Sequence, residues 1–594
     1  MKTYYPIRIP GIINMLLVSF LFLLSCNKVE IFNRFEPLAT GTQDLSKKVN
    51  SSVSGFITNE NGQPLAAASV YAGSSSTTTD QYGYFEIKNT QVIQNAAFVT
   101  VERAGYFKGI KTYIATAGED AFFRIQLIPK IIVGIFNSAS GGSVAAGKNL
   151  AISFQPDGII NATTGAAYSG NVNVAAYRID PVANDLYKIM PGDQRGISSD
   201  GVIKGLTTYG MAAVELSGSS GELLQIAPGK KATLKMTLPA SLLQNAPSSI
   251  PLWYFDEKTG LWSEQGSASR TGDTYSGEVS HFSFWNFDKA DTYVHFSCTV
   301  RDVAGNPLVN TLVKISRADD PNSAGYGFTN SDGFVSGAVP ANTGLNLEIK
   351  GGEQCGTPVY TQQFSTTGVD LSLGIIIVDA KGGLAFVSGT ITGCDAQPVN
   401  NGVMILQKDG QYYRFTSDNK GSYRFTTPLC SSSAIAGFTA YDVSTNQYSN
   451  EVNQLISISA PNRVDLKACG NTSAQFINYT INGVSYKFTY PADNFAPVTP
   501  DQNFTFLASN NMYEAGFQFT GTDILSNSTR PLNYFMASQI QEPLIMVSPV
   551  MVTLTERGEN DQFFAGNFTG SFVGSGADHK IYTISCSFRV KCIL

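Results

Sequence analysis

The sequence predicts an all-β protein made of a string of antiparallel β-sandwich modules. At 594 residues, the chain is too long for a single hydrophobic core. From residue 53 onward, period-two runs of apolar residues alternate with turns rich in Gly, Asn, Asp and Pro, a pattern typical of antiparallel sandwiches. Charged residues make up only 14% of the chain, its net charge is −6, and no Lys/Arg cluster stands out. We therefore expect no nucleic-acid partner.

The first 25 residues have the pattern of a secretory signal peptide. Lys2 and Arg8 precede an apolar run over residues 11–24, which is short for a membrane span. The run ends in Leu-Leu-Ser-Cys26, which resembles a bacterial lipobox and implies lipidation of Cys26. Several acyl chains on one residue give stable membrane anchoring. We expect an exported, lipid-anchored chain at the outer membrane, facing the periplasm or the cell surface; a cleaved signal with an incidental Cys26 is the alternative.

One strand-and-turn pattern then occurs three times, with different units between and after the copies. A polar stretch without hydrophobic periodicity separates the signal peptide from the first copy, and the last unit is rich in Tyr and Phe. The predicted units are the signal peptide (1–25), a tether (26–50), a first sandwich (51–129), a distinct β domain (130–290), a second sandwich (291–378), a third sandwich (385–468) and a C-terminal antiparallel domain (470–594).

Each copy contains an Asx-Gly turn followed by alternating apolar residues. The segments are "TTDQYGYFEI" with Asp80, "TNSDGFVSGAV" at 329–339, and "TSDNKGSYRF" with Asp418 and Gly421. An Asp side chain can cap its own turn, and Gly supplies the positive φ that such turns need. A calcium site requires several converging oxygen ligands, and one Asp per turn is few. We predict a structural role for these turns and no metal site.

The residues of the first copy resemble a known family of small sandwiches. Gly55, Pro64-Leu65 with Ala68, and Asp80-x-x-Gly83-x-Phe85 are similar to the carboxypeptidase-regulatory-like fold, which is common in exported Bacteroidetes proteins. The resemblance implies a seven-stranded β-sandwich in each copy. It also implies that the modules act as spacers or presenting platforms and carry no catalytic unit.

The unit at 130–290 ends in "GEVSHFSFWNFD". With its Gly-Gly opening, "FQPDGII" and a Trp-Tyr-Phe strand, it resembles the ZU domain, the related GAIN domain and part of the cartilage intermediate layer proteins. In some members of these families an HFS tripeptide cuts itself. That implies His281 as general base and Ser283 as the nucleophile that attacks the Phe282 carbonyl. The competing interpretation, which we favour, is that His281 and Ser283 belong to an ordinary terminal strand.

Cysteines supply a further set of predictions, because export permits disulfides. Besides Cys26 there are seven, so at least one lacks an intramolecular partner; they are Cys298, Cys355, Cys394, Cys430, Cys469, Cys586 and Cys592. We predict a bridge between Cys394 and Cys430, one strand pair apart in the third copy, and then Cys355 with Cys469. With no CxxC and three histidines, we expect neither a zinc site nor any cofactor.

The remaining motifs offer little chemistry. The GxxxxGK match at 142–148 is followed by Asn149 and a strand-like run, so it lacks the helix N-terminus of a phosphate loop. No pair of acidic residues stands out for glycoside hydrolysis. Tyr479, Tyr486, Phe488 and Tyr490 alternate along one strand and are either a sugar-stacking face or a core face. We favour the core.

Taken together, these features predict a non-catalytic envelope lipoprotein that presents β-sandwich modules to a glycan or a protein partner. Its other contact is with the membrane, through the lipid anchor. Two alternatives stay open. One is a structural or assembly component of an outer-membrane complex, and the other is a self-cleaving protein cut between Phe282 and Ser283.

Overall fold

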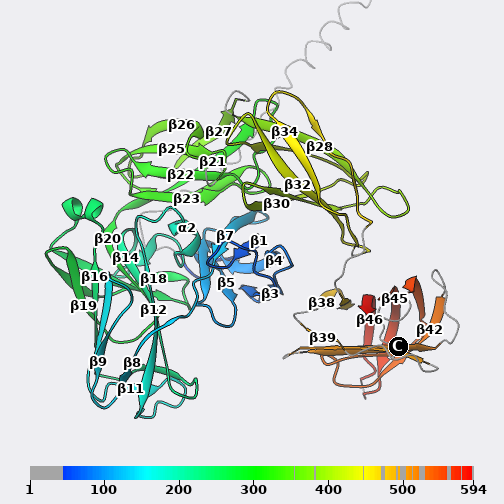
Figure 1. The fold of residues 1–594 in the computed structure, drawn as a ribbon, viewed down its shortest axis with the longest axis horizontal. Helices are drawn as coiled ribbons and strands as arrows, with labels where there is room; N and C mark the ends of the chain where they lie inside the picture. The colour runs from blue at the N-terminus through cyan, green and yellow to red at the C-terminus, as the bar shows by residue number, and fades with distance from the viewer. Residues whose placement is uncertain are drawn as a thin grey trace, which may run out of the picture.

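A computed structural model describes residues 44–352, 355–379, 383–445, 447–469, 475–489, 493–495, 503–510, 513–520, 529–557, 563–576 and 578–591. The described chain is all-β, as predicted: its strands form antiparallel-rich sheets in five successive units (Figure 1). Helical structure in these ranges is limited to α2 (Leu186–Ile189) and the 3₁₀ turns η1 (Gln94–Ala96) and η2 (Ala240–Asn245). No helix in the described ranges has the length and apolar character needed to cross a membrane. The predictions for Cys26, Tyr490 and Cys592 lie outside them.

The first sandwich, residues 48–126, packs two sheets face to face. The sheet orders are β4-β1-β7 and β3-β2-β5-β6. Alternate residues such as Val53, Val70 and Val99 point into the shared core, as the period-two pattern requires. The strands are β1 (Lys48–Thr58), β2 (Ser69–Ala72), β3 (Ser75–Thr78), β4 (Tyr84–Ile93), β5 (Ala97–Glu102), β6 (Gly109–Tyr113) and β7 (Asp120–Gln126).

The second sandwich, residues 293–378, repeats this topology strand for strand. Its sheets run β24-β21-β27 and β23-β22-β25-β26, and β27 pairs parallel with β21 as β7 does with β1. The strands are β21 (Tyr293–Asp302), β22 (Leu312–Arg317), β23 (Ala324–Phe328), β24 (Phe334–Pro340), β25 (Gly344–Lys350), β26 (Pro358–Ser365) and β27 (Leu371–Val378).

The third sandwich, residues 384–467, has the same plan with its last strand broken in two. One sheet contains β31-β28-β35 with β36 beside β28, and the other contains β30-β29-β32-β33 with β34 beside β32. The strands are β28 (Leu384–Thr392), β29 (Val403–Lys408), β30 (Gln411–Thr416), β31 (Ser422–Pro428), β32 (Ser433–Asp442), β33 (Gln447–Tyr448), β34 (Val452–Ser457), β35 (Asn462–Arg463) and β36 (Leu466–Lys467).

The middle domain, residues 132–291, is one 13-stranded sheet folded around its own core. Strands β14, β17 and β20 are buried on both faces: one face lines this core and the other meets the first sandwich. The strands are β8 (Ile132–Asn137), β9 (Gly142–Ala145), β10 (Leu150–Phe154), β11 (Ile159–Asn161), β12 (Asn171–Ile179), β13 (Arg195–Ile197), β14 (Ile203–Ser217), β15 (Leu223–Ile226), β16 (Ala232–Thr237), β17 (Ser249–Asp256), β18 (Leu261–Thr271), β19 (Thr274–Val279) and β20 (Phe284–Asp291). Because β9 turns directly into β10, the GxxxxGK match opens no helix.

The C-terminal domain, residues 476–591, is a 10-stranded antiparallel sheet around an aromatic core. Tyr479 and Phe488 are buried in that core and Tyr486 packs against it, so the core interpretation is confirmed for these three residues. The strands are β37 (Phe476–Ile481), β38 (Val484–Thr489), β39 (Asn494–Phe495), β40 (Asn503–Ser509), β41 (Glu514–Thr520), β42 (Thr529–Ala537), β43 (Leu544–Met546), β44 (Met551–Arg557), β45 (Phe563–Gly574) and β46 (Ile581–Lys591).

The disulfides involve the four predicted cysteines, but the predicted pairing is wrong. Cys394 bonds Cys469 with Cα atoms 4.7 Å apart, and Cys355 bonds Cys430 with Cα atoms 5.2 Å apart. Strand β36 pairs with β28 in parallel, so the chain leaves both strands at the same edge of the sheet. Cys394 and Cys469 each lie two residues after these strands and are therefore close together. Cys430 follows β31 at the border with the second sandwich, where it meets Cys355. Two further cysteines, Cys298 and Cys586, are buried free thiols.

Candidate functional site

The HFS tripeptide lies in a bend just before β20. The Gln225 side chain holds its central peptide: the Phe282 N–H donates to Gln225 Oε1 at 2.7 Å, and Gln225 Nε2 donates to the Phe282 carbonyl at 3.0 Å. The Phe282 ring is buried in the middle-domain core, 5.7 Å from the Phe154 ring between centroids. These contacts anchor the tripeptide to its own domain.

The predicted base and nucleophile of the tripeptide make separate contacts. The Ser283 hydroxyl donates to the Phe284 carbonyl at 3.1 Å. The His281 ring packs edge-on against Tyr254 at 4.7 Å and near Trp285 at 5.1 Å, and burial lowers the pKa of His281. No hydrogen bond between His281 and Ser283 occurs in this described segment. The Ser283 hydroxyl therefore donates its proton to a backbone carbonyl, and the His281 ring packs on aromatic neighbours.

The repeated turns are built alike in all three sandwiches. Asp80 Oδ1 accepts the N–H groups of two residues in its own turn at 2.9 Å each, and Asp418 Oδ1 does so at 2.8 and 2.9 Å. In the second sandwich the same place is taken by Asn330, whose Oδ1 accepts two turn N–H groups at 3.0 and 2.9 Å. Because a neutral amide replaces the carboxylate here, these contacts require an acceptor oxygen and no charge. Among the described residues, no group of three or more His, Cys, Asp or Glu side chains could hold a metal ion.

A buried arginine joins the three sandwiches. Arg124, on β7 of the first sandwich, donates to Gln411 Oε1 at 3.1 Å and to the Tyr412 carbonyl at 2.7 Å in the third. Its guanidinium also lies over rings from all three sandwiches, at 4.8 to 5.8 Å from the centroids of Phe56, Phe122, Phe328 and Tyr413. A planar guanidinium can donate in its plane and stack on rings above and below it, so one side chain suits this junction.

A second polar cluster joins the first sandwich to the middle domain. Lys111 Nζ donates to the carbonyls of Tyr187 at 2.7 Å and Met190 at 2.5 Å. Arg195, fully buried, pairs with Asp193 at 2.7 Å and donates to the Asn95 carbonyl of the first sandwich at 2.7 Å. Burial lowers the pKa of Lys111 to about 7. A continuous apolar cluster that includes Phe107 and Trp262 surrounds these contacts.

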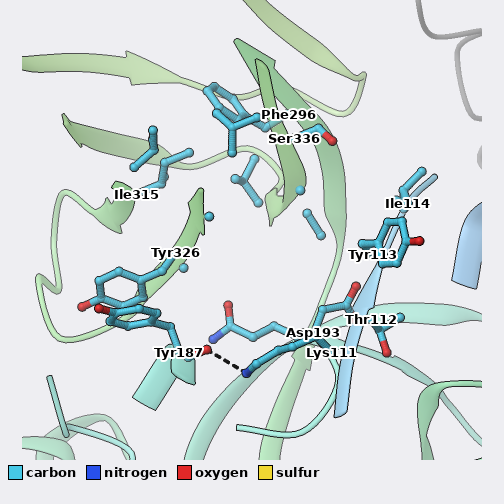
Figure 2. A pocket seen from close by; sticks show the side chains of 18 of the residues that line it. Lys111, Thr112, Tyr113, Ile114, Tyr187, Asp193, Phe296, Ile315, Tyr326 and Ser336 are labelled. Atoms are coloured by element: carbon cyan, nitrogen blue, oxygen red, sulfur yellow. Dashed lines mark hydrogen bonds between the residues drawn. The ribbon is translucent and has the colours of Figure 1, made fainter. Parts of the chain in front are cut away.

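A cavity of about 250 Å³ lies where the first sandwich, the middle domain and the second sandwich meet. Lys111, Tyr187 and Asp193 lie on one side of it and Phe296, Ile315 and Ser336 on the other (Figure 2). The Tyr187 ring stacks on Tyr326 across the boundary between the middle domain and the second sandwich, with centroids 4.8 Å apart. A mostly apolar cavity with a few polar groups at its border has the character of a small-molecule site.

Sequence reasoning missed both the junction and the cavity. Arg124 lies in an ordinary alternating strand, "DAFFRIQL", and Lys111 in another, so neither has a local signal. A comparison of the three copies position by position would have shown one clue: β23 and β24 of the second copy contain glycines where the third copy has aromatic residues.

Exposed aliphatic side chains occur in several units, such as Ile135 on β8 and Ile375 on β27, and two of them form a cross-strand pair on the third sandwich. Ile435 on β32 and Leu455 on β34 lie directly opposite each other, with 72% and 61% of their surface exposed. The exposed aromatic residues of the described chain are scattered over several units and form no such pair: Tyr71, Tyr177, Phe386 and Tyr513.

Comparison with known proteins gives distant similarity. No protein-family model matches the chain. Cartilage intermediate layer protein 2 of Homo sapiens is 25% identical over 226 residues, covering 36% of this chain and 19% of that protein; the Mus musculus protein is 25% identical over 222 residues with the same coverage. The chain thus spans about a fifth of the length of these relatives. This match supports the similarity to cartilage intermediate layer proteins and assigns no activity.

Solved structures give weaker likenesses. The shaft pilin SpaA from Lactobacillus rhamnosus GG is 10% identical with a TM-score of 0.16, covering 30% of this chain and 100% of that one. BcpA, the major pilin subunit of Bacillus cereus, is 8% identical with a TM-score of 0.12, covering 71% and 100%. Scores this low carry no argument. The sheets of the chain itself establish an all-β protein of sandwich modules. Its sequence is distantly similar to cartilage intermediate layer protein 2 over about a third of its length.

Proposed function

We propose that this chain is a non-catalytic lipoprotein of the cell envelope that presents a rigid array of β-sandwiches to a protein partner. The observation that carries the proposal is the exposed pair Ile435 and Leu455 on paired strands of the third sandwich. Exposed aliphatic pairs on ordered strands are suited to burial against another protein.

Contacts that tie the sandwiches to one another support a presenting role. The disulfide Cys355–Cys430 crosses from the second sandwich to the third, and Arg124 contacts all three sandwiches. A surface held this way loses little conformational freedom on binding, which favours affinity. The modules' similarity to carboxypeptidase-regulatory-like sandwiches points to the same role.

A protein partner fits the surface better than a glycan does. Sugar rings stack on flat aromatic faces. The aromatic row predicted as an alternative sugar platform, Tyr479 and Phe488, is instead buried in the C-terminal core. The exposed pair on the third sandwich is aliphatic.

Cross-linking in intact cells, read by mass spectrometry, tests the proposal. We expect the wild-type chain to cross-link to one envelope protein, and the double variant Ile435→Lys with Leu455→Lys to lose that product. The matched control is Ser433→Lys with Ser457→Lys, which places the same charges two pairs along on the same strands and should keep the product. An unchanged product in the Ile435 and Leu455 variant, or saturable binding on a glycan array, contradicts a protein partner at this surface.

The lipid anchor has its own test. Replacing Cys26 by Ala should abolish incorporation of labelled fatty acid and release the chain from the membrane fraction. Continued labelling of the Cys26→Ala chain contradicts the lipobox assignment. It does not affect the proposed partner surface, which the cross-linking experiment tests separately.

A further inference from the structure

The second sandwich carries a glycine where the other two carry a larger apolar side chain. At the same distance after the capping Asx of each turn lie Ile87 on β4, Gly337 on β24 and Phe425 on β31. Each pairs with a core-facing residue of its first strand, so all three positions face the space between the sheets. For Gly337 that partner is Phe296, whereas Phe425 pairs with Val387.

The facing edge strand shows the same replacement. Gly327 on β23 pairs with Val313, and Phe415 on β30 pairs with Met404 at the equivalent register. In the third sandwich the Phe415 and Phe425 rings stack with centroids 3.8 Å apart and close that side of the core. The second sandwich has glycine at both positions. At Gly327 the Val335 side chain takes up the space, since an added Cβ would lie 2.8 Å from Val335 Cγ2, whereas the place at Gly337 stays open.

The space so opened forms the inner part of the 250 Å³ cavity, whose lining includes Phe296, Val313, Gly327 and Gly337. Apart from its two chain neighbours, no residue has a heavy atom within 4 Å of a Cβ atom added at Gly337, so this position faces open space. Lys111 and Tyr187 border the cavity from the neighbouring units (Figure 2).

Every charged side chain that lines the cavity already has a partner in the protein. The pairs are Lys111 with the Tyr187 and Met190 carbonyls, Glu119 with Asn330, Asp120 with Ser331, Arg124 with Gln411 and Tyr412, Asp193 with Arg195, Asp291 with Lys289, and Arg317 with Asp319. Asp193, Asp291 and Arg317 are ion-paired, and the other four are hydrogen-bonded to neutral groups of the protein. A charged ligand would have to displace one of these contacts to reach an opposite charge, which is costly in a mostly apolar site.

We propose that this cavity binds a small, neutral aromatic molecule, with one ring in the place that the Phe425 ring occupies in the third sandwich. The repeat itself shows that an aromatic ring fits between these sheets, and the stacked Tyr187 and Tyr326 rings add an aromatic wall. The lining of the cavity does not include Ile435 or Leu455, so ligand binding here can be tested independently of the proposed partner surface.

Ligand-observed NMR titration of residues 27–594 tests the proposal. This chain lacks only the signal peptide and Cys26, so no lipid phase absorbs the probe. We expect saturable binding of benzyl alcohol and at least tenfold weaker binding of benzoate, which has the same ring and a negative charge. Gly337→Phe should lower the affinity for benzyl alcohol at least tenfold by filling the space. Gly368→Phe, the same change at an exposed loop glycine of the same sandwich, should leave it unchanged.

Absence of saturable benzyl alcohol binding to the wild-type chain overturns the proposal, as does wild-type affinity in a folded Gly337→Phe variant. If that variant does not fold, photolabelling of the wild-type chain with an aryl diazirine tests where the ligand binds. We expect label on β23, β24 or Phe296 that benzyl alcohol displaces. Label that is spread over the surface, or that benzyl alcohol does not displace, contradicts the site.

Discussion

Asp80, Asn330 and Asp418 show that one side-chain oxygen is enough to build the repeated turn. Each accepts two backbone N–H groups, and each is followed by a glycine with φ between 69° and 76°. The side chain therefore satisfies donors that the tight turn leaves without a backbone acceptor.

Asp418→Ala should expose those two N–H groups and weaken the turn by about 1 kcal/mol. Asp418→Asn should be nearly neutral, because Asn330 already fills this role in the second sandwich. Hydrogen exchange at the Lys420 and Ser422 amides measures both changes. Equal acceleration in the two variants would show that the carboxylate charge matters, contrary to this account.

At the HFS tripeptide we expect the chain to stay whole. Ser283 donates to the Phe284 carbonyl and the His281 ring packs on Tyr254, so neither side chain is placed for an acyl shift. Purified wild-type protein held at neutral pH should run as one full-length band on a denaturing gel, indistinguishable from Ser283→Ala. Two fragments of similar size in the wild type alone would establish self-cleavage.

Residue patterns predicted the turns well and the cysteine partners poorly, for one physical reason. A turn is capped by residues two and four positions away, so its contacts are visible in the local sequence. A disulfide depends on which strand ends emerge together. The parallel pairing of β36 with β28 sets the position of Cys469, and nothing in the residues around it indicates that pairing.

At the scale of elements, strand β21 joins the middle domain to the second sandwich and carries a buried histidine. His295 lies near Arg195 of the middle domain, and its backbone N–H donates to Asp370 Oδ1. Burial, and then the Arg195 charge, lower the pKa of His295 to about 4, while Asp370 opposes the shift. The folded chain therefore holds His295 neutral under conditions in which an unfolded chain protonates it.

This difference predicts a loss of stability in acid. The unfolded state binds the extra proton below pH 6.5 and the folded state only near pH 4, so stability is lost as the pH falls through that window. The contribution is at most about 3 kcal/mol. Urea unfolding between pH 4 and 7 should show a shallower pH dependence for His295→Gln than for the wild type. His579→Gln, at an exposed histidine, is the control; an unchanged slope in His295→Gln contradicts the assignment.

At the scale of the molecule, contacts between units hold the three sandwiches and the middle domain together, and the two disulfides act at different levels of this assembly. Both close loops with a sequence separation of 75 residues, so the chain-entropy model gives each about 4 kcal/mol. One lies within the third sandwich, whereas the other joins the second sandwich to the third.

Removing the disulfides should therefore have different effects on shape. Cys355→Ser with Cys430→Ser should broaden the distribution of distances between the second and third sandwiches, measured by small-angle X-ray scattering. Cys394→Ser with Cys469→Ser should lower the melting temperature of the third sandwich and leave the spacing unchanged. An unaltered scattering profile for the first pair would mean that Arg124 and its aromatic neighbours suffice to hold the units together.

The amino-acid sequence was enough to predict the strands, the turns and the threefold repeat, because side-chain alternation and turn capping act over a few residues. It also sufficed to place Tyr479 and Phe488 in a core. How the units meet depends on tertiary packing: the Arg124 junction, the Cys355–Cys430 bridge and the lining of the cavity at Gly337 each bring together residues that are far apart in the chain. Such contacts arise from packing between finished sandwiches, and no local pattern records them.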